Sequence, residues 1–237
     1  HPTTFVFHSA YPTVSGLCIS ISSKIICMRL AIRFLSVTFF VLISGLCTAQ
    51  DTLKVMQYNL LFYPGSSGNR ASLYLKDILA YAQPDVLMVN ELTDASGVST
   101  ILDDALNQYG VTHYANATFN NGPGMDNMLF YNTDKLVLVG QDVITTSPRY
   151  TNGYKLYLKD PNLAYHKDTT FVNFYVSHLK SSQGYENDRA IAASAIRNYL
   201  DAKSDVSNHF IAGDFNLYTS SEDAYEEFLD TGNCQFF

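Results

Sequence analysis

Apolar and polar positions alternate in strand-like and helix-like patterns from residue 52 onward. Short apolar runs closed by turn signals, such as the run that ends at Pro64-Gly65, are typical of buried strands. Longer stretches with apolar residues three and four positions apart are typical of helices packed on one face. The pattern predicts strands at residues 52–62, 85–92, 113–119, 127–132, 136–146, 154–158, 169–180 and 209–216, and helices at residues 69–82, 94–110, 185–203 and 221–230.

The order of these elements predicts the fold class. Helices alternate with strands in the first part, and a block of adjacent strands follows in the middle. This order favours an α/β (α+β type) domain of mixed sheets covered by helices over a purely parallel open sheet. No repeat, low-complexity tract or interdomain linker interrupts residues 51–237, so we expect one domain there.

The first 50 residues have a different character. Met28 is followed by basic residues, a continuous apolar run and the small-residue sequence Cys-Thr-Ala before Gln50. This arrangement predicts a secretory signal peptide at residues 28–49 and a secreted or cell-surface protein. A lipoprotein anchor at Cys47 is less favoured, because the preceding Leu46 is bulky. The apolar run is too short to predict a membrane span.

Residues 1–27 contain no acidic residue, and the chain begins with His1 rather than methionine. We therefore expect these residues to be a non-native upstream extension. The alternative is a long basic and aromatic extension of the folded protein. N-terminal sequencing of the exported protein distinguishes the two.

Charge and cysteine content change once the signal peptide is set aside. The whole chain of 237 residues has a net charge of −7, but all 22 acidic residues and 12 of the 15 basic ones follow residue 50, which leaves −10. Such an acidic protein lacks the overall positive charge of a dedicated nucleic-acid-binding protein. It is compatible with phosphate-ester hydrolysis if a metal ion supplies local positive charge. Cys234 is the only cysteine after the signal peptide, so no internal disulfide is expected.

Four predicted strands end in residues capable of metal binding or proton transfer. Strand ends on one edge of packed sheets gather into a cleft, where ligands commonly bind. Each residue also has a structural interpretation, namely a loop glutamate, a structural asparagine, a core histidine and turn residues after a glycine. The residues are Asn59, Glu91, His178, and the pair Asp214 and Asn216.

Together these residues are chemically coherent. A glutamate and amide oxygens suit Mg²⁺, with Mn²⁺ or Ca²⁺ as alternatives, rather than Zn²⁺. If Asp214 and Asn216 lie on an extended segment, their side chains share one face and together orient a water molecule. A nearby histidine could contact a phosphoryl oxygen or transfer a proton. The set predicts metal-assisted in-line attack of water on a phosphate ester.

The sequences VMQYNLL, PDVLMVNEL, FYVSHLKSS and FIAGDFN occur in the order and spacing of the endonuclease/exonuclease/phosphatase superfamily, which the chain resembles from about Leu53 onward. The resemblance implies a four-layer α/β sandwich, with two packed mixed sheets flanked by helices and a divalent-metal phosphoesterase site. It implies that Asn59 and Glu91 bind metal, and that His178 contacts or protonates the phosphoryl group. Asp214 and Asn216 then position the water and stabilise the transition state.

Arg189 is a further candidate for this site. It matches a supporting arginine of the superfamily, and a residue on the helix surface is the equally favoured alternative.

The resemblance departs from the family pattern at one point. Family members carry a further strand with an Asp-His pair, and nothing after Asn216 supplies it. We therefore expect the last strands of the domain to be missing from this chain. The 237-residue chain is then expected to be inactive or poorly folded, and its complete parent to be an enzyme.

For the complete protein we expect a secreted phosphodiesterase, specifically a monomeric nuclease acting on DNA or RNA, with no stable protein partner. The alternatives are a phosphatase or sphingomyelinase-type phospholipase of the same fold, and a non-catalytic, degenerate binding module.

Overall fold

A computed structural model describes residues 3–6, 52–65, 69–161, 169–203 and 208–229. The chain divides into two units, and the unit that contains residues 53–237 holds all the strand-end residues singled out above. The predicted signal peptide, residues 28–49, lies outside the described residues, as does most of the predicted upstream extension. Both assignments stay predictions. Among the described residues, no helix is long and apolar enough to cross a membrane.

The first sheet, sheet A, has the strand order β1-β2-β3-β5-β4. Strands β2 and β3 are parallel, whereas β5 pairs antiparallel with both β3 and β4. The two helices predicted for this half of the chain each form as a pair of consecutive helical segments, one of them wound as a π-helix. The elements are β1 (Thr3–Val6), β2 (Lys54–Tyr63), η1 (Ala71–Leu75), α2 (Lys76–Ala82), β3 (Val86–Leu92), α3 (Ser96–Ile101), η2 (Leu102–Leu106), β4 (Tyr114–Asn116) and β5 (Asp126–Asn132).

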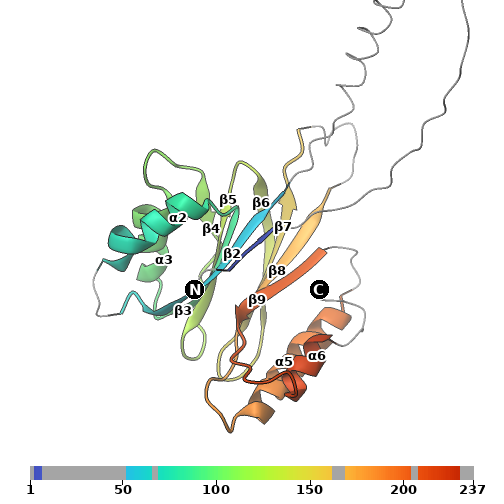
Figure 1. The fold of residues 1–237 in the computed structure, drawn as a ribbon. Coiled ribbons are helices and arrows are strands. Elements are labelled where there is room, and N and C mark those ends of the chain that lie inside the picture. Colours follow the sequence, from blue (N-terminus) through green and yellow to red (C-terminus); the bar gives the residue numbers. More distant parts are fainter. Residues whose placement is uncertain (1–2, 7–51, 66–68, 162–168, 204–207, 230–237) are drawn as a thin grey trace, which may run out of the picture. The chain divides into compact units, whose positions relative to one another are not determined.

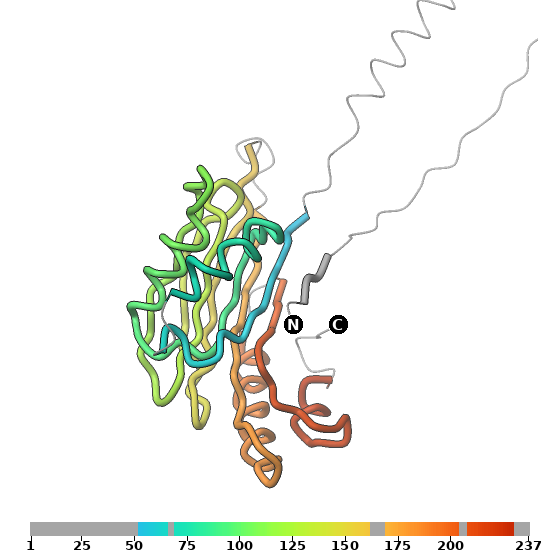
Figure 2. The backbone as a smooth tube through the Cα atoms, turned by 60° about the vertical axis from the view of Figure 1, so that its left-hand side comes forward, coloured from blue at the N-terminus to red at the C-terminus, as the bar shows by residue number. Residues whose placement is uncertain are grey.

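The second sheet, sheet B, has the order β6-β7-β8-β9. Its last two strands are parallel, and its other neighbouring strands are antiparallel. The elements are β6 (Leu136–Ile144), β7 (Thr151–Leu158), β8 (Phe171–His178), α5 (Glu186–Asp201), β9 (Asn208–Asp214) and α6 (Asp223–Leu229). Figures 1 and 2 show α2 and α3 on one side of the strands and α5 and α6 on the other.

Alternation along β8 shows how the layers are held together. Phe174 and Val176 are buried in the core shared by the two sheets, whereas Tyr175 packs in a second core with Ile196 and Leu200 of α5. Successive side chains of a strand point to opposite faces, so one strand contributes to both cores. Burial of a large apolar side chain contributes roughly 1.5–3 kcal/mol. Sheet B is therefore fixed both to sheet A and to its own helices.

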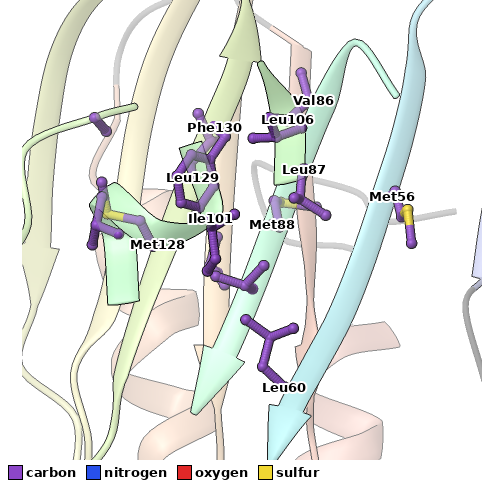
Figure 3. Close-up of a cluster of buried hydrophobic side chains, with 14 of the residues drawn as sticks. Met56, Leu60, Val86, Leu87, Met88, Ile101, Leu106, Met128, Leu129 and Phe130 are labelled. Atoms are coloured by element: carbon purple, nitrogen blue, oxygen red, sulfur yellow. The ribbon is translucent and has the colours of Figure 1, made fainter. Parts of the chain in front are cut away.

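The core of sheet A follows directly from its sequence. All seven residues of β3 are buried, as expected for a central strand covered on both faces. Figure 3 shows Leu87 and Met88 of β3 among neighbours from β2, β5 and the helices, including Met56, Ile101 and Phe130. The predicted α/β fold of two packed mixed sheets flanked by helices is confirmed.

The two parallel pairs decide where chemistry can occur. In β2 and β3, Asn59 lies opposite Asn90, and in β8 and β9, His178 lies opposite Asp214. The carboxyl ends of parallel strands meet at one edge of a sheet, where ligands bind in α/β proteins. Each sheet therefore brings one such edge to the site.

Candidate functional site

The two sheet edges meet through hydrogen bonds from Asn59. Its Nδ2 donates to Glu91 Oε1 over 2.9 Å within sheet A, and to Asp214 Oδ2 over 3.0 Å across to sheet B. Ligand atoms of Glu91, His178 and Asp214 all lie within 4.8 Å of one another. Residues from four strands thus form one cluster. Their predicted positions at strand ends had indicated that they would lie close together.

Glu91 is held in a strained backbone conformation. Its φ is +68°, in the left-handed region that glutamate rarely adopts, and it lies at an irregularity in the pairing of β3 with β5. Such a conformation costs about 1–3 kcal/mol and persists where the surroundings impose it, commonly at functional sites. Glu91 is buried and belongs to β3, so the interpretation as a loop residue past the strand is wrong.

Below the site, buried amides align the two sheets. Asn90 Nδ2 donates to the carbonyl oxygen of Ser177 over 3.0 Å, and to Asn127 Oδ1 over 2.7 Å. Asn90 precedes Glu91 and Ser177 precedes His178, so this hydrogen bond between the sheets fixes the two site residues relative to each other. Buried hydrogen bonds of this kind contribute about 1 kcal/mol each and specify one arrangement. No pattern in the sequence singled out Asn90 or Asn127.

His178 is buried but not satisfied by its neighbours. Among the described residues its Nδ1 has no hydrogen-bond partner, and its Nε2 lies 3.9 Å from Glu91 Oε1, beyond hydrogen-bond distance. Burial lowers its pKa most, the Arg149 charge lowers it further, and the Asp214 and Glu91 charges oppose this shift. The imidazole is therefore neutral at neutral pH, with one ring N–H to donate. This geometry differs from that of a satisfied core histidine.

Gly213 allows the close approach of β9 to β8. A Cβ atom at this position would lie 1.8 Å from the carbonyl oxygen of Ser177, so no residue with a side chain fits without moving the strand. Only glycine therefore keeps Asp214 in register with His178.

The Asp214–Asn216 pair differs from the expectation. Strand β9 ends at Asp214, and Asn216 has φ +52°, so the two side chains do not share one face of an extended segment. Asp214 Oδ1 instead accepts the backbone N–H of Asn216 over 3.2 Å, and Asn216 Nδ2 donates to the carbonyl oxygen of Leu179 over 3.1 Å. The Asp214 side chain thus closes a turn. Asparagine suits position 216 of this turn, because it adopts positive φ more readily than most residues. The turn leaves Asp214 Oδ2 facing Asn59.

Arg149 is a cation of this site that was not among the residues predicted from the sequence. It precedes β7, and its Nη1 donates to the carbonyl oxygen of Leu179 over 3.1 Å. Burial lowers its pKa, and the nearby charges of Glu91 and Asp214 raise it. A guanidinium remains protonated in proteins and suits phosphate oxygens. The sequence offered no local signal for it, because Arg149 lies in a loop between strands.

Arg189 occupies a different place. It is fully buried in α5, so the interpretation as a helix-surface residue is wrong. Its Nε donates to Glu222 Oε2 over 2.7 Å, and its Nη1 donates to the carbonyl oxygens of Lys180 and Ser182. Arg189 therefore ties the segment after His178 to the segment that follows Asn216. It is a positioning residue, because the partners it has among the described residues lie outside the cluster of Glu91, His178 and Asp214.

The donor set of the cluster fits a hard divalent cation. Two carboxylates and an imidazole lie within 4.8 Å of one another, and like charges this close are unfavourable without a cation. Glu91 is the residue best placed to hold it, with Asp214 beside it. Asn59 Oδ1 accepts the backbone N–H of Leu61 over 2.9 Å, so direct ligation by Asn59 requires its amide to turn over.

Comparisons with known proteins identify the family and the fold. A sequence model of the Endonuclease/Exonuclease/phosphatase family matches residues 56–227. The human Nocturnin catalytic domain with bound sulfate is 22% identical, with a TM-score of 0.53, over 75% of this chain and 69% of that one. No curated protein matches.

Two further solved structures show the same fold. Danio rerio TDP2 with a single-stranded DNA product is 15% identical, with a TM-score of 0.51, over 71% of this chain and 62% of that one. A mannosyl-6-phosphatase from Bacteroides thetaiotaomicron is 16% identical, with a TM-score of 0.51, over 75% of this chain and 70% of that one. This chain thus spans about two thirds of the length of these proteins. With the family match over most of the chain and these shared folds, the chain belongs to the Endonuclease/Exonuclease/phosphatase family of phosphoesterases.

Proposed function

We propose that the complete protein is an exported, divalent-metal-dependent phosphodiesterase, and specifically a nuclease. The observation that carries this proposal is the meeting of Glu91, His178 and Asp214 within 4.8 Å at the carboxyl ends of two parallel strand pairs. A divalent cation bound by the Glu91 carboxylate would neutralise charge on the phosphoryl group. Mg²⁺ suits these oxygen donors and commonly completes its coordination with substrate phosphate oxygens.

The residues of the chain have separate roles in this proposal. The Asp214 carboxylate accepts a proton from the attacking water while the water oxygen bonds to phosphorus. The bond to the leaving oxygen breaks with its electron pair on that oxygen, and the leaving alkoxide takes a proton from solvent. Neutral His178 donates its ring N–H to a non-bridging oxygen, and the Arg149 guanidinium offsets the charge that develops there. Asn59 keeps Glu91 and Asp214 at a fixed separation through its two hydrogen bonds.

Hydrolysis assays of protein expressed from the complete reading frame test this function, with the 237-residue chain in parallel. We expect Mg²⁺-dependent cleavage of plasmid DNA that EDTA abolishes and that exceeds turnover of sphingomyelin and inositol phosphates. Preference for one of the latter substrates would favour the phosphatase or phospholipase alternative. Absence of turnover with Mg²⁺, Mn²⁺ and Ca²⁺ would favour a non-catalytic binding module.

Arg149 provides a prediction at this site. In Arg149→Met we expect kcat/KM to fall about 10²–10³-fold, because a charged donor to the transition state is lost. Arg149→Lys, which keeps the charge without the fork of donors, should retain part of this activity. In metal-free protein, removal of the positive charge should raise the pKa of His178, which an NMR titration of its ring nitrogens measures. An unchanged His178 pKa in Arg149→Met would contradict the electrostatic contact.

A further inference from the structure

Two large apolar side chains are exposed directly beside the site. Leu61 and Phe62 follow Asn59 in β2 and keep 64% and 56% of their surface exposed. Their backbones are bonded to the site itself: Leu61 N–H donates to Asn59 Oδ1 over 2.9 Å, and Phe62 N–H donates to Glu91 Oε2 over 3.1 Å. Phe62 is thus attached to the same carboxylate that we place at the metal.

This pair is held rigidly in an unfavourable conformation. Leu61 and Phe62 both have φ +52°, a region that non-glycine residues rarely adopt and that costs about 1–3 kcal/mol per residue. The Arg70 guanidinium compensates by donating to the carbonyl oxygens of Leu60, Leu61 and Phe62 over 2.8, 2.9 and 3.1 Å. The neighbouring Tyr63 is buried and anchors the end of the segment. The sequence therefore keeps two apolar side chains in water at a fixed place.

A single exposed apolar residue needs no explanation, but a strained and clamped pair at a reactive site does. We propose that Phe62, supported by Leu61, is a specificity-determining platform on which an aromatic ring attached to the scissile phosphate, such as a nucleobase, stacks. The inference rests on the proposed phosphoesterase function and names the chemistry of the substrate. A flat ring matches the face of a phenylalanine, and such stacking tolerates any base.

The charge of the chain favours this occupant over a membrane surface. A lipid surface is usually bound by a broad apolar face with a basic rim, and anionic lipids attract Lys and Arg. The net charge of −10 after residue 50 opposes such binding, and the pair is a small patch. A substrate with one phosphate and one aromatic ring requires only the local cation Arg149 and this platform.

Two esters with the same leaving group isolate the contribution of the ring. Thymidine 5′-(4-nitrophenyl) phosphate and its abasic analogue differ only in the base. For complete protein with Mg²⁺, we expect a lower KM for the thymidine ester. In Phe62→Ala its KM should rise about 10- to 100-fold, the range expected for loss of one stacked base. The abasic ester should keep its kcat and KM, and Phe62→Trp should preserve the preference.

Tyr81→Ala is the matched control, because Tyr81 is an aromatic residue exposed to 93% in α2, which leads into the opposite end of β3. Substitution of Tyr81 should leave kcat and KM unchanged for both esters. An equal rise in KM for both esters in Phe62→Ala would overturn the proposed platform and indicate that Phe62 acts on site geometry alone. An unchanged preference accompanied by weaker binding to phosphatidylcholine vesicles would also overturn it, in favour of a membrane contact.

A binding measurement separates failure of the platform from failure of the proposed function. If neither ester is hydrolysed, the phosphoesterase proposal fails, and titration with thymidine 5′-phosphate and 2-deoxyribose 5-phosphate tests the platform alone. The platform predicts tighter binding of the nucleotide by about 10- to 100-fold, and loss of that difference in Phe62→Ala. Equal affinity of the unsubstituted protein for the two ligands would overturn it.

Discussion

Asp214→Asn in the complete protein should lower kcat by about 10²–10⁴-fold, with little change in KM. The substituted amide has nearly the same shape, and its one oxygen can accept from Asn59 Nδ2, 3.0 Å away in the unsubstituted protein, although not also from the Asn216 N–H. It cannot accept a proton from water, so it removes the proposed base and leaves most of the geometry. Steady-state kinetics with a phosphodiester over a range of Mg²⁺ concentrations measures the loss.

The same substitution should stabilise the metal-free protein. Ligand atoms of Asp214 and Glu91 lie within 4.8 Å of each other, and their like charges repel in the folded state. If removal of this repulsion stabilises the folded state by about 1 kcal/mol, Tm should rise by roughly 2–4 °C for a domain of this size. Lower activity together with higher stability is characteristic of a strained reactive site.

Asp103→Asn is the matched control, because Asp103 is an exposed aspartate in η2. It removes the same charge from the chain and should change neither kcat nor Tm. If Asp214→Asn retained the kcat of the unsubstituted protein, the assignment of Asp214 as the base would be untenable.

Arg189→Ala should destabilise the protein by about 3–5 kcal/mol, the usual result of breaking a buried ion pair on one side. The substitution leaves the Glu222 carboxylate buried without its 2.7 Å partner, and it frees the carbonyl oxygens of Lys180 and Ser182. Since total stabilities are commonly 5–15 kcal/mol, this is a large share. Urea unfolding at neutral pH measures it as a lower midpoint.

Two further variants separate the buried charge from the packing. Arg189→Lys keeps the charge but not the fork of donors, so it should recover only part of the stability. The double variant Arg189→Met with Glu222→Leu should be more stable than Arg189→Ala, because no unpaired charge remains. If the unfolding midpoint of Arg189→Ala equalled that of the unsubstituted protein, Arg189 would not join the two segments.

The pH dependence of this pair has a definite sign. The hydrogen bond from Arg189 lowers the pKa of Glu222 below its ordinary value of 4.5. A carboxyl group whose pKa is lower in the folded state stabilises the protein above the pKa of the unfolded state. This stabilisation is lost as the pH falls from 4.5 through the lower folded pKa. The difference in stability between the unsubstituted protein and Arg189→Ala should therefore shrink in acid.

The sequence by itself determined the elements and the candidates at their ends. Strand β3 is recognisable because a fully buried strand must be apolar along its length, and Glu91 stands out at its end because a carboxylate there is costly without a partner. The four family motifs occur in a fixed order along the chain. These features are local in sequence, so a single chain was enough to predict the fold and to nominate Asn59, His178 and Asp214.

The tertiary structure alone decided how these residues meet and which others join them. Asn59 and Asp214 are 155 positions apart along the chain, yet they share a hydrogen bond because one sheet packs on the other. The same packing brings Arg149 near Glu91, and the packing of α5 buries Arg189, although Arg149 lies in a loop without a recognisable motif and Arg189 on a helix. Within sheet A, the pairing of β2 with β3 places the Phe62 N–H against the Glu91 carboxylate. Periodicity reports which face of an element is buried, but the partners across that face come from residues distant in sequence, and no local pattern encodes them.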